Sequence, residues 1–364
     1  MFLIFDPIYI VLAIFGYLLM FILAGFIAPR VANKFAGRFS LYTSMFILAA
    51  MVIFSFSFVI ILIFYVLNTQ LDLGVYEISS LFFGVILLVF ISNLITYILS
   101  PLIINFLYGV REDSKIQKIV DEVKKELNYK GKIKGMIATN FSLPNAFAYG
   151  NFIFGKYVAV TSGMINLVNE KELKAVIGHE IGHHMHRDNA VMLLFGLLPS
   201  IIYFLGYFLI RISIFSGSSE RESRGNILLL ALGIFAVIIS FIIQILVLAF
   251  SRLREYFADI EGAKSAGKLS MQSSLAKLHY YYEANLDVLN ELRNNQTKTL
   301  FIYAFTQAIA NPFANLDNAL SKSSSIEKKR IEELKKLEVS SIQEFLSTHP
   351  PIPKRLRFLD TLKD

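Results

Sequence analysis

Five long apolar segments constrain the fold of this chain more than any other feature. A helix needs about 20 consecutive apolar residues to cross roughly 30 Å of hydrocarbon. The segments of this kind are residues 8–28, 41–67, 81–107, 191–211 and 227–250. The mean hydropathy of +0.56 is too high for a soluble chain of 364 residues. The sequence therefore predicts a polytopic α-helical membrane protein.

The apolar segments divide the chain into four parts. We predict an N-terminal transmembrane region over residues 1–107, a polar part over 108–190, a transmembrane hairpin over 191–250 and a second polar part over 251–364. The first apolar segment lacks a basic N-terminal flank and is longer than the apolar core of a typical secretory signal, so we expect it to be a retained span.

The charges of the loops predict the orientation. Arg30, Lys34 and Arg38 follow the first span without an acidic residue, whereas Asp72 and Glu77 follow the second span without a basic one. Basic loops stay in the cytoplasm. Counting spans from there, we expect a multi-pass protein of the cell membrane with both large polar parts in the cytoplasm.

A short motif in the first polar part is typical of metal-assisted hydrolysis. Residues 179–183 read His-Glu-Ile-Gly-His, and the apolar spacing over 171–185 predicts a helix. Residues four apart share a helical face, so His179 and His183 can bind one zinc ion while Glu180 reaches the water on that ion. A surface helix with solvated histidines is the alternative interpretation.

A third zinc ligand is predicted on a second helix, after the transmembrane hairpin 191–250. The hairpin returns the chain to the same side of the membrane, where Glu255 can join the two histidines. Asp259 lies one turn further and can accept the second ring N–H of a zinc-bound histidine. Alternatively, the two acids simply form ion pairs with Arg252 or Arg254.

The residue types available support one zinc ion per chain. Since the chain has no cysteine, histidine and carboxylate are the only strong ligands. Three protein ligands leave a fourth position for water, whose pKa falls to roughly 7. Glu180 would then act as the general base that takes the water proton.

Three short segments predict a small antiparallel sheet packed on the zinc helix, as in an α+β zincin-like domain. They cover residues 132–138, 145–149 and 157–161 and are separated by turn residues. The middle segment is a candidate edge strand that could hold an extended substrate backbone, and it includes Asn145, Ala146, Phe147 and Ala148. An ordinary strand of the sheet is an equally compatible interpretation.

The net charge of +7 comes from basic residues spread over loops and the C-terminal third. No basic patch is interleaved with aromatic residues, so we expect the lipid bilayer and no nucleic acid as a partner. A charged insertion covers residues 287–299 and 321–341, with a solvated helix predicted over 326–337.

Three motifs together resemble HtpX-type membrane zinc metalloproteases, which are gluzincins related to CAAX prenyl proteases. They are Pro-Asn-Ala-Phe-Ala at 144–148, the 179–183 motif and Arg-Glu-Tyr-Phe-Ala-Asp at 254–259. The resemblance covers roughly residues 81–364, and the chain departs from the family in its extra N-terminal span and its charged insertion.

The resemblance implies a membrane endopeptidase with a cytoplasmic zinc site held by His179, His183 and Glu255. Its implied substrates are unfolded polypeptides and misfolded or damaged membrane proteins, in protein quality control. Thr348-His349-Pro350-Pro351 followed by Arg355 is similar to the C-terminal family motif. There His349 could bond the developing oxyanion or cap the zinc, while Arg355 could orient it; a structural role is the alternative.

Two other functions stay open at this point. A CAAX prenyl-type processing protease shares these motifs but usually encloses its site within more spans. A catalytically idle, zinc-stabilised membrane scaffold would have no use for the intact Glu180, because a structural zinc site usually closes its fourth position.

Overall fold

The computed structural model describes residues 38–70, 74–140, 143–215, 220–284, 324–338 and 349–362. The predicted first span at 8–28 lies outside these residues, and so does the 287–299 part of the predicted insertion.

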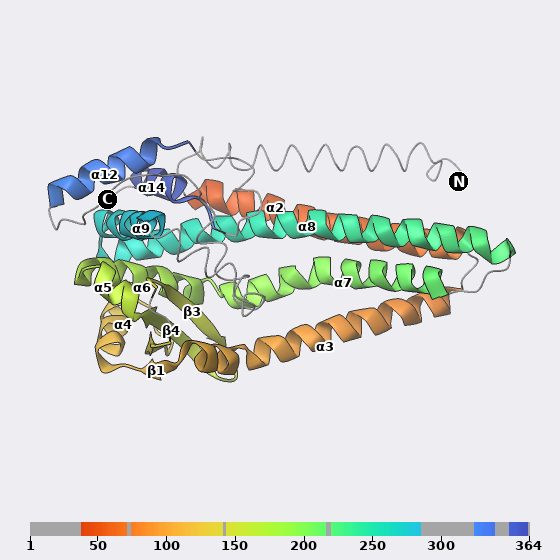
Figure 1. The fold of residues 1–364 in the computed structure, drawn as a ribbon, viewed down its shortest axis with the longest axis horizontal. Coiled ribbons are helices and arrows are strands. Elements are labelled where there is room, and N and C mark those ends of the chain that lie inside the picture. The colour runs from red at the N-terminus through yellow and green to blue at the C-terminus, as the bar shows by residue number, and fades with distance from the viewer. Residues whose placement is uncertain are drawn as a thin grey trace.

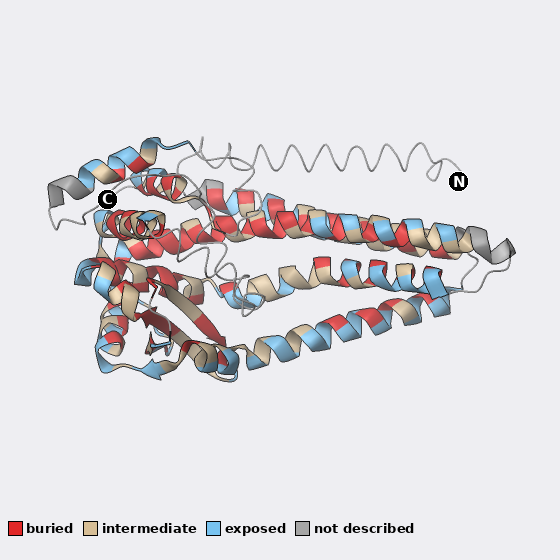
Figure 2. Cartoon of the chain, viewed as in Figure 1, coloured by how far each residue is buried: buried red, intermediate tan, exposed pale blue. Residues whose placement is uncertain are grey.

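Four long helices run side by side along the longest axis of the molecule (Figure 1): α2 (Arg38–Gln70), α3 (Val75–Tyr108), α7 (Asp188–Phe215) and α8 (Glu220–Ala266). Each is long and apolar enough to cross a membrane, and each contains one of the predicted spans. Exposed residues recur along these helices (Figure 2). They include large apolar ones such as Phe46 and Phe83, as expected of helix faces that contact lipid. The chain is thus a multi-pass membrane protein.

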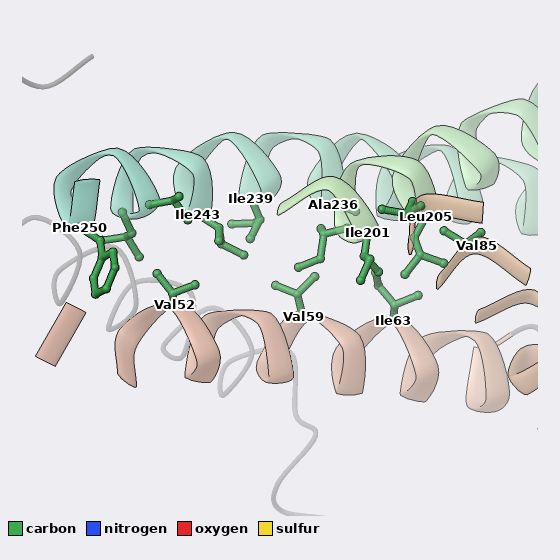
Figure 3. Close-up of a cluster of buried hydrophobic side chains, with 14 of the residues drawn as sticks. Val52, Val59, Ile63, Val85, Ile201, Leu205, Ala236, Ile239, Ile243 and Phe250 are labelled. Carbon is green, nitrogen blue, oxygen red and sulfur yellow. The ribbon is translucent and has the colours of Figure 1, made fainter. Parts of the chain in front are cut away.

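The interior of this bundle is apolar and closely packed. Buried side chains from all four helices meet there (Figure 3): Val52, Val59, Ile63, Val85, Ile201, Leu205, Ala236, Ile239 and Ile243. Where α7 crosses α8, a Cβ atom on Gly233 would lie 2.7 Å from the carbonyl oxygen of Gly206. Small residues let membrane helices approach this closely, so the two glycines set the α7–α8 contact.

A four-stranded sheet forms at one end of the bundle. Its strands are β1 (Val110–Glu112), β2 (Lys134–Ala138), β3 (Ala146–Asn151) and β4 (Gly155–Thr161). Their spatial order is β1-β2-β4-β3, which places β3 at an edge.

The predicted sheet is present, but it is mixed rather than wholly antiparallel. The β1–β2 and β3–β4 pairs are antiparallel, whereas β2 and β4 are parallel. The burial of β4 explains the difference, because Val158, Ala159 and Val160 are completely buried. A strand buried on both faces belongs inside a sheet, so β4 inserts beside β2 and β3 is left outside.

Helix α6 (Glu170–Met185) packs on this sheet, together with α4 (Ser114–Glu126) and α5 (Ser162–Leu167). Ile177 and Ile181 of α6 are fully buried in one apolar cluster with side chains of β4. At the other end of α6, Arg187 has a φ of 56° and turns the chain directly into α7. The sheet and α7 therefore hold α6 from two sides.

Three C-terminal helices complete the described structure: α9 (Lys268–Ala284), α12 (Ser324–Lys336) and α14 (Ile352–Asp360). The helix predicted near 326–337 exists as α12, but it is not fully solvated. Ile331 and Leu334 are buried in a cluster with Leu356 and Leu359 of α14. Ile331 and Leu334 are three residues apart and lie on one face of α12, between charged residues. This face packs against α14.

Candidate active site

The crossing of α6 and α8 brings the two halves of the candidate site together. A Cβ atom on Gly262 of α8 would lie 2.8 Å from the carbonyl oxygen of Ala175 on α6. A Cβ atom on Gly182 of α6 would lie 3.1 Å from the Cα atom of Ala258. The helix backbones approach this closely only because glycine has no side chain. Residues separated by the transmembrane hairpin are thereby placed in contact.

His179 and His183 of α6 face Glu255 of α8 at this crossing. One ligand atom from each residue can be chosen so that all three lie within 4.8 Å of one another. The Nε2 atom of His179 is 3.6 Å from Glu255 Oε2, and the Nε2 atom of His183 is 3.5 Å from Glu255 Oε1. Two imidazoles and one carboxylate form a donor set that suits a zinc ion. These residues therefore fit a single metal ion.

Both histidine rings are oriented by a carboxylate on their other nitrogen. The Nδ1 atom of His179 is 3.0 Å from Asp259 Oδ1, and the Nδ1 atom of His183 is 2.7 Å from Asp188 Oδ2. An ionised carboxylate only accepts hydrogen bonds, so each Nδ1 donates its proton. When the rings are neutral, each Nε2 offers its lone pair to the shared point near Glu255, and this is the tautomer that a metal needs.

Each of these carboxylates is in turn paired with an arginine. Arg355 donates from Nε to Asp259 Oδ2 at 2.8 Å, and Arg254 forms an ion pair with Asp188. Neither the contact of Asp188 with His183 nor its pairing with Arg254 was predicted from the sequence. Asp188 opens α7 beyond the end of α6, so the rule that residues four apart share a helical face does not reach it.

The environment shifts the pKa values of the two rings in opposite directions. Burial lowers the pKa of His179, but hydrogen bonds to Asp259 and Glu255 raise it overall to about 9. Burial lowers the pKa of His183, and the attraction of Glu255 does not fully offset this. A metal ion binding to His179 would therefore displace a proton.

Glu180 touches the edge of the sheet. Its Oε2 atom accepts a hydrogen bond from the backbone N–H of Ala148 at 2.7 Å. Ala146, Phe147 and Ala148 belong to the edge strand β3, while Asn145 precedes it and donates its N–H to Thr161 Oγ1 at 2.9 Å. The predicted edge segment and the predicted base are thus neighbours in space.

The segment that leads into α14 also reaches the site. The Nδ1 atom of His349 is 2.8 Å from Glu255 Oε2, and Arg355 lies 3.6 Å from the same oxygen. His184, by contrast, is buried against the sheet, where its Nε2 donates to the Tyr157 carbonyl oxygen at 2.9 Å. Burial lowers the pKa of His184 to about 4, so this ring is a neutral packing residue.

Membrane-spanning helices together with a cluster of two histidines and one glutamate that could hold a metal ion are the features of a membrane metallopeptidase. The sequence model of Peptidase family M48 matches residues 110–363, and the chain belongs to this family.

Among known proteins, the chain is similar to two that are named Protease HtpX homolog. It is 50% identical to the one from Archaeoglobus fulgidus over 359 residues, which cover 99% of this chain and 98% of that protein. It is 49% identical to the one from Pyrobaculum aerophilum, with 100% of both chains covered. Among solved structures, Ste24p of S. mikatae gives a TM-score of 0.47 at 17% identity, covering 88% of this chain and 66% of that one.

Proposed function

We propose that this chain is a zinc-dependent endopeptidase in which His179, His183 and Glu255 hold one zinc ion and Glu180 is the general base. One observation carries the proposal: three potential ligand atoms, two from α6 and one from α8, lie within 4.8 Å of one another, and the two histidines share α6 with Glu180. The carboxylates on both Nδ1 atoms add to this support, because zinc-binding histidines almost always have such partners.

In the proposed reaction, the ion would lower the pKa of a water molecule to roughly 7 and polarise a peptide carbonyl. Glu180 takes a proton from the attacking water and returns it to the leaving amine. The Ala148 N–H holds one of its oxygens at 2.7 Å and leaves the other for this proton. His349 donates a hydrogen bond to the developing oxyanion, and Arg355 positions the site through Asp259.

The proposed substrates are unfolded segments of misfolded or damaged membrane proteins. An edge strand binds an extended backbone through main-chain hydrogen bonds and so selects unfolded chains rather than one sequence. The contact between β3 and Glu180 supports this role for residues 145–148, because a chain added to this edge would lie beside the base. Quality control of membrane proteins is the corresponding cellular role.

We further propose that the active site faces the cytoplasm. The support is the excess of Arg30, Lys34 and Arg38 in the first loop, under the positive-inside rule. In this arrangement residues 108–190 and 251–364 form the cytoplasmic part, and residues 1–107 and 191–250 form the membrane part.

The decisive experiment compares the parent with Glu180→Gln. Both proteins are purified in detergent with a chelator, given zinc, and incubated with an unfolded protein. We expect zinc-dependent cleavage by the parent alone, while both proteins bind one zinc ion. Glu126→Gln, which changes an exposed acid at the end of α4, serves as the matched control and should cleave like the parent.

Two results would contradict this proposal. If Glu180→Gln cleaves as fast as the parent, then Glu180 is not the base. If neither protein cleaves although both bind zinc, a prenylated C-terminal peptide is the next substrate. Its cleavage would indicate a prenyl-type processing protease, and its persistence would favour a zinc-stabilised scaffold.

A further inference from the structure

The turn between β3 and β4 consists of three apolar residues, Phe152, Ile153 and Phe154, which we call the apolar turn. Hairpin turns are normally built from Gly, Asn, Asp or Ser and face water. Here Phe152 is 77% exposed and Ile153 is 52% exposed. Two large apolar side chains at the tip of a turn need a non-aqueous partner.

The apolar turn is fastened to the surface of α3. Asn151, which precedes it, donates from its side-chain amide to the carbonyl oxygens of Tyr97 at 2.9 Å and Ile98 at 3.0 Å. Pro101 has no N–H, so the carbonyl oxygen of Tyr97 lacks its helical backbone partner. It accepts from two side chains instead, Asn151 and Ser100, whose Oγ lies at 2.9 Å. The ring of Phe152 also stacks on Tyr97, with 6.2 Å between the centroids.

The attachment lies level with one end of a second span. Asn189, two residues before the apolar segment 191–211 of α7 begins, donates to the carbonyl oxygen of Gly150 at 3.3 Å. On α3, the contacts to Tyr97 and Ile98 lie in the second half of the apolar segment 81–107. Both spans therefore place the apolar turn toward the same side of the hydrocarbon.

The exposed surface of α3 beside the apolar turn is apolar as well. Leu99, Leu102, Ile103 and Phe106 are all exposed there. The patch on the turn is therefore continuous with the lipid-facing surface of a span. Tyrosine and other amphipathic rings such as Tyr97 are also typical of the boundary between lipid and water.

We propose that the apolar turn inserts Phe152 and Ile153 into the boundary between lipid headgroups and acyl chains around α3. The partner is the bilayer itself. Because a strand rises about 3.3 Å per residue, β3 then leads from the lipid surface at Asn151 to Ala148, which contacts Glu180. If the proposed protease function holds, this placement offers the edge strand to polypeptide segments that emerge from the membrane.

The experiment uses the fact that the chain contains no tryptophan. Phe152→Trp is placed in the full chain in phosphatidylcholine vesicles whose acyl chains carry bromine near the headgroup or near the methyl end. Phe90→Trp on the exposed middle of α3 is the deep control, and exposed Leu337→Trp after α12 is the aqueous control.

We expect the Phe152→Trp emission to lie at shorter wavelength than that of Leu337→Trp, with strong quenching by the shallow bromine and little by iodide. Phe90→Trp should be quenched most by the deep bromine. If Phe152→Trp is quenched by iodide like Leu337→Trp, the proposal fails.

Shielding from iodide without quenching by either bromine would also overturn the proposal and would indicate a protein partner. Ile153→Trp repeats the test in case the first variant does not fold. The readout does not depend on cleavage, so it is separate from the test of the protease function.

Discussion

The smallest unit that explains the candidate site is a chain of three residues, histidine, aspartate and arginine, which occurs twice. His179 is followed by Asp259 and Arg355, and His183 is followed by Asp188 and Arg254. Each aspartate fixes the tautomer of its ring, and each arginine keeps the aspartate ionised in a buried position. Asp259 could be predicted from its helical spacing to Glu255, whereas Asp188 could not.

Asp188→Asn tests the unpredicted chain at the residue scale. Asparagine keeps the shape but loses the charge that holds the Nδ1 proton of His183. We expect zinc affinity to fall about 10-fold to 100-fold, with the fold retained, in a competition titration against a chromophoric chelator. Asp121→Asn, an exposed acid of α4, is the control and should leave the affinity unchanged. Equal affinities in the two variants would contradict a positioning role for Asp188.

At the scale of elements, the site depends on how closely α6 and α8 cross. Ala175 and His179 of α6 lie against Gly262 of α8, where a Cβ atom would meet the Ala175 oxygen at 2.8 Å and the His179 Cβ at 3.3 Å. A backbone oxygen in a packed helix cannot move away as a flexible side chain can. The distance between the helices therefore determines whether Glu255 reaches the histidines.

Gly262→Ala should force the two helices apart. We expect a loss of about 1–3 kcal/mol of stability, as for other overpacked cores, together with weaker zinc binding. Gly196→Ala on α7 is the matched control, because its new Cβ atom would meet nothing within 4 Å. Thermal unfolding in detergent measures the stability of both variants. The same unfolding temperature in the two variants would argue against the close crossing.

Glu172 links α6 to α9 and makes this contact dependent on pH. It accepts hydrogen bonds from Ser273 Oγ at 2.5 Å and Lys277 Nζ at 2.8 Å. Burial raises the pKa of Glu172, but the hydrogen bonds from Lys277 and Ser273 lower it by more. The pKa of Glu172 is therefore lower than the ordinary value of 4.5.

Because the folded state lowers this pKa, the stabilisation is present above about pH 4.5 and is lost as the pH falls through the lowered value. Glu172→Gln should cost roughly 2 kcal/mol at neutral pH and flatten the acid limb of a stability profile measured by denaturant unfolding. Glu126→Gln changes an exposed acid at the end of α4 and should leave that limb as it is. A profile unchanged by Glu172→Gln would exclude the bridge.

At the scale of the whole molecule, α8 connects the membrane part to the site. It has 47 residues and is thus about 70 Å long, more than twice the thickness of the hydrocarbon. One continuous helix therefore begins in the bundle and carries Glu255 and Asp259 to α6 at its other end (Figure 1). The direction in which α8 crosses the membrane therefore determines on which side of the membrane the site lies.

The proposed orientation can be tested with single cysteines, because the chain has none of its own. Val75→Cys marks the start of α3, and Glu126→Cys marks the end of α4 beside the sheet; both residues are exposed. If the site faces the cytoplasm, an impermeant maleimide should label Val75→Cys in intact cells and Glu126→Cys only after permeabilisation. The opposite pattern, read as a mass shift on a gel, would invert the topology.

The sequence by itself determined the membrane-spanning character of the chain and the helix that carries His179, Glu180 and His183. Both follow from local physics. Backbone N–H and C=O groups in hydrocarbon must form hydrogen bonds within their own segment, and residues four apart share a helical face. The position of Glu255 could also be anticipated, because the hairpin must return to the side from which it left.

Only the tertiary structure decided the order of the strands, the pairing of Asp188 with His183, and the attachment of the apolar turn to α3. Each depends on contacts between segments far apart in the chain, such as Asn151 with the Tyr97 carbonyl oxygen. Such contacts are selected by the shape and burial of whole elements, as when the fully buried β4 displaces β3 to the edge. The periodicity of a single segment does not indicate which strand takes the inner position of the sheet.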